Sequence, residues 1–135
     1  MVIVDTSAWI EYFRNRNQTV ALKVDECLNG DLVGIGDIIY CEIAKGIKAM
    51  KERNEVCSLL NSLPHFDMVG FTIAEQAAAN YRTLRANGVT VRKTIDVIIG
   101  TFCAENKHQL VHNDRDFTLM APHIGLDIYQ SEDPV

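Results

Sequence analysis

The sequence lacks the features that mark several classes of protein. Its four cysteines include no C-x-x-C pair and have no histidine at zinc-finger spacing, which argues against a thiolate metal site. We expect them to be small buried hydrophobic residues in a reducing compartment. The N-terminus has no basic segment followed by a long apolar stretch, and the run around VIIGTFCA is far shorter than the ~20 residues of a membrane span. We therefore predict a cytoplasmic protein with no membrane contact.

Positive charge is also scarce. The 13 Lys and Arg residues face 18 Asp and Glu residues, which leaves a net charge of −5. This balance argues against loose, nonspecific attachment to nucleic acid or anionic membranes, so an anionic substrate would need local positive charge. The hydrophobic content of 47% in 135 residues predicts a single domain, 1–135, whose core needs no disulfide or structural metal.

Short apolar strands alternate with helical patterns along the chain. This rhythm predicts an α/β fold with helices flanking a parallel sheet. The expected strands lie at 2–4, 33–35, 110–111 and around 126–130. An apolar stripe from Ile39 to Met50 predicts one helix after the second strand, and Thr94 is the expected N-cap of a helix whose first turn holds Asp96.

Four acidic residues occupy corresponding places in this pattern. Asp5 and Asp114 each follow a strand, whereas Glu42 and Asp96 lie in early turns of helices. Taken singly, Asp5 could cap a helix, Asp96 could favour a helix dipole and Glu42 could be a solvated neighbour of Lys45. Taken together, they predict a cluster at the carboxyl end of the sheet, where open α/β sheets bind ligands.

Such a cluster would need a cation. Four carboxylates within ~4 to 6 Å of one another would repel by several kcal/mol in total at an effective dielectric constant near 20. A divalent ion removes this conflict, and ligands that are all oxygen favour Mg²⁺ or Mn²⁺. Such an ion can hold a phosphate and activate water, so the pattern favours phosphodiester hydrolysis.

Four stretches of the sequence together resemble the PIN domain, specifically the VapC-type toxin of toxin–antitoxin pairs: VDTSAWIEYF, CEIAKG, TIDVIIGTFCAENK and LVHNDRDF. The resemblance implies a three-layer α/β/α fold with a central, mostly parallel sheet. It also implies a metal-dependent endoribonuclease toxin, a homodimer and a cognate antitoxin that inserts a peptide into the active groove. The acidic quartet of the family falls on Asp5, Glu42, Asp96 and Asp114, with Asp5 and Asp96 as the firmest metal ligands.

Three residues near the quartet have supporting roles in this interpretation. Ser7 matches a family position whose hydroxyl supports the acids. At His112 many relatives carry Thr or Ser, and we favour a structural or peripheral role over proton transfer for this histidine. For Asp116 we likewise favour a structural role over metal ligation.

Basic residues near the acids could guide RNA. Lys45 and Lys48 follow Glu42, and Arg92 and Lys93 precede Asp96, so both pairs could hold phosphates, although exposed basic residues are as often only solvated. Two other functions remain open. One is a noncatalytic RNA-binding or partner-binding PIN module. The other is a small metal-dependent phosphatase with Asp5 as nucleophile. The usual D-x-D motif of such enzymes is missing, because Ser7 occupies the position of the second aspartate.

Overall fold

Five short strands form one parallel sheet in the computed structural model, which describes residues 1–131. The strands are β1 Val2–Val4, β2 Val33–Gly36, β3 His65–Phe66, β4 Gln109–Val111 and β5 Asp127–Ile128. Their order is β3-β2-β1-β4-β5, with β1 in the centre, where Ile3 pairs with Gly34 on one side and Leu110 on the other. Continuous apolar runs such as Val2–Val4 are typical of strands buried on both faces of a parallel sheet.

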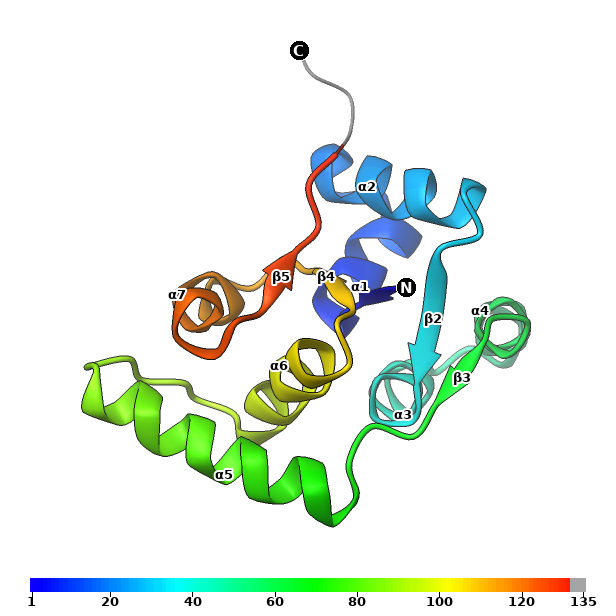
Figure 1. Ribbon diagram of the computed structural model, residues 1–135. Helices are drawn as coiled ribbons and strands as arrows, with labels where there is room; N and C mark the ends of the chain where they lie inside the picture. Colours follow the sequence, from blue (N-terminus) through cyan, green and yellow to red (C-terminus); the bar gives the residue numbers. More distant parts are fainter. Residues whose placement is uncertain (132–135) are drawn as a thin grey trace.

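The helices of residues 1–131 form two groups about the sheet (Figure 1). The first group contains α1 Thr6–Arg14, α2 Gln18–Asn29, α3 Asp37–Gly46 and α4 Met50–Asn61, and the second contains α5 Gly70–Ala86, α6 Thr94–Glu105 and α7 Arg115–Ile124. From β1 to β3 the chain moves toward one side of the sheet, and from β3 to β5 it moves toward the opposite side. Because crossovers between parallel strands are right-handed, the two directions of movement place the two groups of helices on opposite faces of the sheet. The fold is the predicted three-layer α/β/α arrangement.

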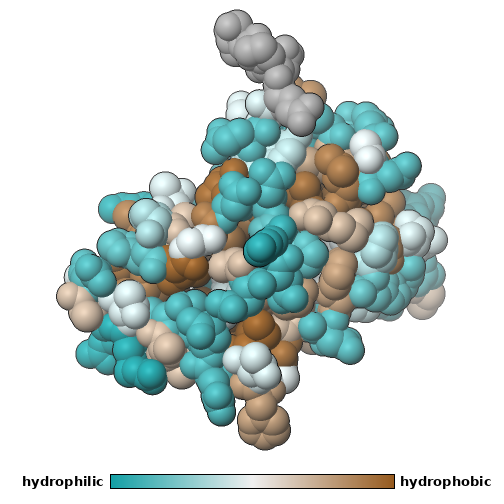
Figure 2. Space-filling model, viewed as in Figure 1, coloured by the Kyte–Doolittle hydropathy of each residue, from teal (hydrophilic) through white to brown (hydrophobic). Residues whose placement is uncertain are grey.

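Large apolar side chains fill the space between the layers. Trp9 and Phe117 are fully buried, and the Trp9 ring stacks on Phe13 with 5.4 Å between centroids. At the end of β2, Gly36 allows the strand to lie against the side chain of Met68, where a Cβ would not fit without a shift of that side chain. On the surface that Figure 2 shows, hydrophilic and hydrophobic patches are interspersed.

The structure corrects two predicted helix boundaries. The helix expected to continue to Met50 ends at Gly46, and Ile47 has extended backbone angles before α4 begins at Met50, whose side chain is exposed. Glycine and a β-branched residue in succession both have low helix propensity, which favours the break there. Thr94 is the first residue of α6 rather than its N-cap, which is Lys93 and makes no side-chain capping hydrogen bond.

The cysteines correct a further expectation. Cys27 and Cys103 are buried as predicted, but Cys57 is only partly buried and Cys41 is exposed on α3.

Helix α7 and strand β3 were not anticipated from the sequence. Within residues 1–131, no helix combines the length and the hydropathy that crossing a membrane requires.

Candidate active site

A crevice is expected beside β1, because the order of the strands reverses there. The chain first passes from β1 to β2 and later returns to place β4 on the other side of β1. In open α/β sheets, ligands bind outside the carboxyl ends of the strands at such a point. Asp5 directly follows β1, and its backbone N donates a 2.9 Å hydrogen bond to the carbonyl oxygen of Val111, the last residue of β4. Asp114 lies three residues beyond Val111, so topology brings two predicted site acids to the same place.

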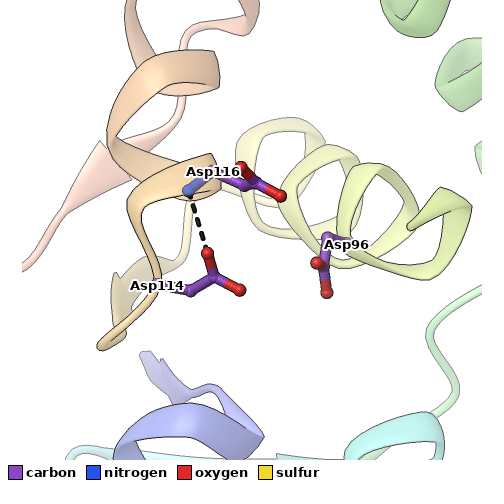
Figure 3. A group of neighbouring side chains, drawn as sticks. All are labelled: Asp96, Asp114 and Asp116. Carbon is purple, nitrogen blue, oxygen red and sulfur yellow. Dashed lines mark hydrogen bonds between the residues drawn. The ribbon is translucent and has the colours of Figure 1, made fainter. Parts of the chain in front are cut away.

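Three carboxylates meet at this end of the sheet. Asp96, Asp114 and Asp116, which we call the acidic cluster, each offer an oxygen atom within 4.8 Å of the others. Figure 3 shows Asp96 on α6 facing Asp114 and Asp116 at the start of α7. The backbone N of Asp116 donates to Asp114 Oδ1 at 2.9 Å, so Asp114 caps α7 while its second oxygen stays available. This geometry is suited to a hard divalent cation.

Asp96 is the member of the acidic cluster with the most unusual environment. Its side chain is buried, and its Oδ2 atom has no hydrogen-bond partner within residues 1–131. Burial, together with the negative charges of Asp5 and Asp114, raises the pKa of Asp96 to about 7, although the positive charge of Lys93 acts in the opposite direction. A buried carboxylate oxygen without a donor is costly unless a proton or a cation neutralises it, so the donor set fits a metal ion.

Asp5 combines two roles that the sequence left as alternatives. It is the N-cap of α1, and its Oδ2 accepts hydrogen bonds from Ser7 N at 3.0 Å and Ser7 Oγ at 2.6 Å. Burial nevertheless raises the pKa of Asp5, and the charge of Asp5 raises that of Asp96. Asp5 therefore caps a helix and also acts electrostatically on the acidic cluster.

Ser7 joins the ends of the two central strands. Its hydroxyl donates to Asp5, which follows β1, and accepts a hydrogen bond from Asn113 N, beyond β4, at 2.9 Å. The hydroxyl is thus used as both donor and acceptor, which leaves it little freedom to rotate. Ser7 therefore contacts Asp5, one of the carboxylates predicted for the site.

Glu42 lies beside the acidic cluster rather than in it. Its Oε1 accepts a 2.9 Å hydrogen bond from Thr6 Oγ1, which ties α3 to the start of α1. The charge of Glu42 contributes to the raised pKa values of Asp5 and Asp96, so it belongs to the same electrostatic environment. Thr6 was not identified from the sequence, where its only signal is its place next to Asp5.

His112 is a partly buried residue that contacts the backbone of the site. Its Nδ1 accepts a hydrogen bond from Asp114 N at 3.1 Å, and its ring centroid lies 5.4 Å from that of Phe117. Burial lowers the pKa of His112, because the charged imidazolium would be poorly solvated. An acceptor at Nδ1 requires that atom to be unprotonated, which is in keeping with the lowered pKa.

The basic residues differ in their relation to the acids. Arg92 Nε lies 3.5 Å from Asp116 Oδ2, while Lys93 is the cap residue of α6 and is exposed. Lys45 and Lys48 are exposed at the end of α3 and in the connection that follows it. The ion pair of Arg92 was not foreseen, because the sequence does not show that the segment before α6 passes next to the start of α7.

The parallel sheet, with carboxylates gathered at its switch point, defines an α/β protein of the class whose ligand site is expected at the carboxyl ends of its strands. Residues 2–121 match the model of the PIN domain. The VapC ribonuclease Mb1587 of Mycobacterium bovis and the ribonuclease VapC11 of Mycobacterium tuberculosis are each 32% identical to the chain over 123 residues, which cover 90% of the chain and 92% of the relative. The chain belongs to the PIN domain family, and within it to the VapC ribonucleases.

Solved structures show the same fold. VapBC2 from Rickettsia felis, bound to a DNA fragment of its promoter, matches with a TM-score of 0.74 at 13% identity and covers 96% of this chain and 98% of its own. VapBC-1 from nontypeable Haemophilus influenzae matches with a TM-score of 0.70 at 20% identity, covering 96% and 97%. At this level of identity the likeness shows the fold alone.

Proposed function

We propose that the chain is the toxin of a toxin–antitoxin pair and a Mg²⁺-dependent endoribonuclease that hydrolyses phosphodiester bonds at the crevice beside β1. The observation that carries this proposal is the buried Asp96 Oδ2, which has no donor within residues 1–131 and faces two further carboxylates. The ribonuclease names of the relatives at 32% identity support the reaction class. The place of action is the cytoplasm.

The residues that would hold Mg²⁺, or Mn²⁺ in its place, are Asp96 and Asp114, with Asp5 and Asp116 beside them and Glu42 at the margin. Their oxygens are the ligands that such ions prefer. When bound, the ion neutralises phosphate charge and makes a water molecule more acidic. The buried carboxylate of Asp96 is stabilised when its charge is neutralised, and either a bound metal ion or a proton can do this.

The side chains have separate tasks in the proposed reaction. Glu42, oriented by Thr6, accepts a proton from the attacking water, and Asp5 is held in place by Ser7. Phosphates of the RNA are bound by the basic residues near the acids, namely Lys45, Lys48, Arg92 and Lys93. Water attacks phosphorus in line with the 3′ oxygen of the RNA, the bond from phosphorus to that oxygen breaks, and the oxygen leaves as a 3′-hydroxyl after taking up a proton. The cut therefore leaves a 5′-phosphate and does not need the RNA 2′-hydroxyl.

An apolar groove beside Glu42 supports an antitoxin as the protein partner. It has a volume of about 140 Å³ and lies between α1 and the α3–α4 pair, lined by Thr6, Ile10, Phe13, Arg14, Glu42, Ile43, Gly46, Ile47, Glu52 and Val56. We propose that a segment of the antitoxin places apolar side chains here and so blocks access to Glu42. A homodimer is part of the same proposal, with Gly46 and Ala49 as exposed small residues that permit close approach.

A cleavage assay tests the proposed function. Purified protein free of antitoxin is incubated with a mixed cellular RNA pool and Mg²⁺, Mn²⁺ or EDTA, and the 5′ ends of the products are mapped. We expect discrete cuts with 5′-phosphate ends that need metal and are lost in Asp5→Asn and Asp96→Asn. Asp127→Asn is the matched control, because Asp127 is exposed and begins β5, at the opposite end of the sheet from the crevice.

Other results would favour the alternatives. Cyclic-phosphate products formed in EDTA would contradict hydrolysis by this site. Metal binding by folded protein without any cutting would favour a noncatalytic PIN module. Faster turnover of small phosphate esters than of RNA, with a phosphoenzyme on Asp5, would favour the phosphatase.

A further inference from the structure

Asp116 already has a positively charged partner. Arg92 Nε lies 3.5 Å from Asp116 Oδ2, and within residues 1–131 no other ion pair involves a member of the acidic cluster. The same carboxylate is one of the three whose oxygens converge within 4.8 Å. The guanidinium group and a divalent cation would therefore use the same negative charge.

The two partners differ in how easily they can leave this contact. The Asp116 side chain is 9% exposed, whereas that of Arg92 is 75% exposed. The contact is a single long one through Nε, without the paired geometry that makes arginine–carboxylate bonds strong. The Arg92 side chain can therefore turn into solvent with little loss of interaction energy, while Asp116 remains beside the other two carboxylates.

The position of Arg92 in the chain also allows such a movement. Arg92 lies in the segment between α5 and α6, two residues before the first residue of α6. Its side chain can be displaced without shifting Asp96, which the first turn of α6 carries. A displaced guanidinium would stay at the rim of the crevice, where a phosphate could accept its hydrogen bonds.

We propose that Arg92 is an internal counter-ion of Asp116 and that a divalent cation must displace its guanidinium group to use this carboxylate. The inference rests on the proposed function, because it assumes that the acidic cluster binds the metal. In the absence of metal, Arg92 offsets part of the repulsion between the acids. Metal binding and the release of Arg92 toward RNA are consequently one coupled event, and the wild-type affinity for metal is lower than the acids alone would give.

Metal affinity measured without RNA tests this inference. Mn²⁺ binding to the full chain is followed by titration calorimetry at constant pH and salt for the wild type, Arg92→Gln and Lys93→Gln. Lys93→Gln is the matched control, because Lys93 also acts on the acidic cluster through its charge but makes no ion pair within residues 1–131, so the difference between the two variants isolates the contact with Asp116. We expect Arg92→Gln to bind Mn²⁺ about two- to five-fold more tightly than Lys93→Gln, the range for an exposed ion pair.

A second comparison assigns the effect to the contact itself. In an Asp116→Asn background, Arg92→Gln should no longer change the affinity, because the partner carboxylate is gone. Equal affinities of Arg92→Gln and Lys93→Gln would overturn the inference, as would a gain that persists in the Asp116→Asn background. Either result leaves the proposed function standing. Failure of the folded wild-type protein to bind Mn²⁺ would overturn both.

Discussion

Replacing Asp96 by asparagine should change how the stability of the metal-free protein depends on pH. Burial and neighbouring charges raise the pKa of Asp96 in the folded protein from 3.8 to about 7. Between these pH values the folded state holds a proton that the unfolded state has lost. The free energy of unfolding of the wild type therefore decreases as pH rises from about 4 to about 7, and stays low above that.

The size of this effect follows from the same values. The difference between 3.8 and about 7 is worth about 4 kcal/mol at about 1.36 kcal/mol per pH unit. This is an upper value, since relaxation of the crevice and entry of water reduce the penalty of a buried charge. The asparagine side chain cannot ionise, so we expect Asp96→Asn to be about 2 to 4 kcal/mol more stable than the wild type at pH 8 and close to it at pH 4.

Urea unfolding in EDTA at intervals from pH 4 to pH 8 measures this difference. Asp127→Asn, an exposed substitution of the same kind on β5, should follow the wild type throughout. Adding Mg²⁺ at pH 8 should stabilise the wild type and leave Asp96→Asn nearly unchanged, because ligand binding to the folded state adds to its stability. A wild-type stability that does not fall between pH 4 and pH 7, or an equal fall in Asp96→Asn, would refute the reasoning.

Two further substitutions test the surroundings of the site. Thr6→Val removes the 2.9 Å hydrogen bond to Glu42 while keeping the shape of the side chain. We expect steady-state kinetics to show that turnover of RNA falls about ten-fold while binding of RNA changes little. Unchanged turnover would exclude a role of Thr6 in orienting Glu42. Ile10→Lys places a charge at the apolar groove, on a residue that is 40% exposed. In a titration of ribonuclease activity, inhibition by the antitoxin should weaken about ten-fold or more, while the melting temperature of the protein is preserved. Inhibition equal to that of the wild type would place the antitoxin elsewhere.

Much of the fold could be predicted from local pattern. The branched apolar residues of β1 indicated a strand buried on both faces, and the alternation of strands and helices indicated a parallel sheet. Strand β3 was missed because His65 and Phe66 are too few to form a pattern. Helix α7 was missed because its residues carry Pro122, which usually interrupts a helix, although here it lies near the end of one.

The site divides in a similar way. Asp5, Glu42, Asp96 and Asp114 could be chosen from the sequence because each lies next to the end of a strand or in a helix at that edge, and the carboxyl ends of parallel strands converge. Asp116 could not be grouped with them, because its carboxylate joins the acidic cluster only when the turn of α7 directs it toward α6. The hydrogen bonds of Ser7 with Asn113 and of Thr6 with Glu42 likewise join residues far apart in the chain.

The sequence by itself therefore determined the class of fold, through its periodicity, and the end of the sheet where acids gather, through their places after strands and in early helical turns; the family followed from the resemblance of four stretches of the chain. Only the tertiary structure decided which carboxylates come within reach of one cation, that Asp96 Oδ2 is buried without a donor within residues 1–131, and that Arg92 pairs with Asp116. The physical reason is that burial and Coulomb interactions depend on distances between segments that sequence spacing does not set.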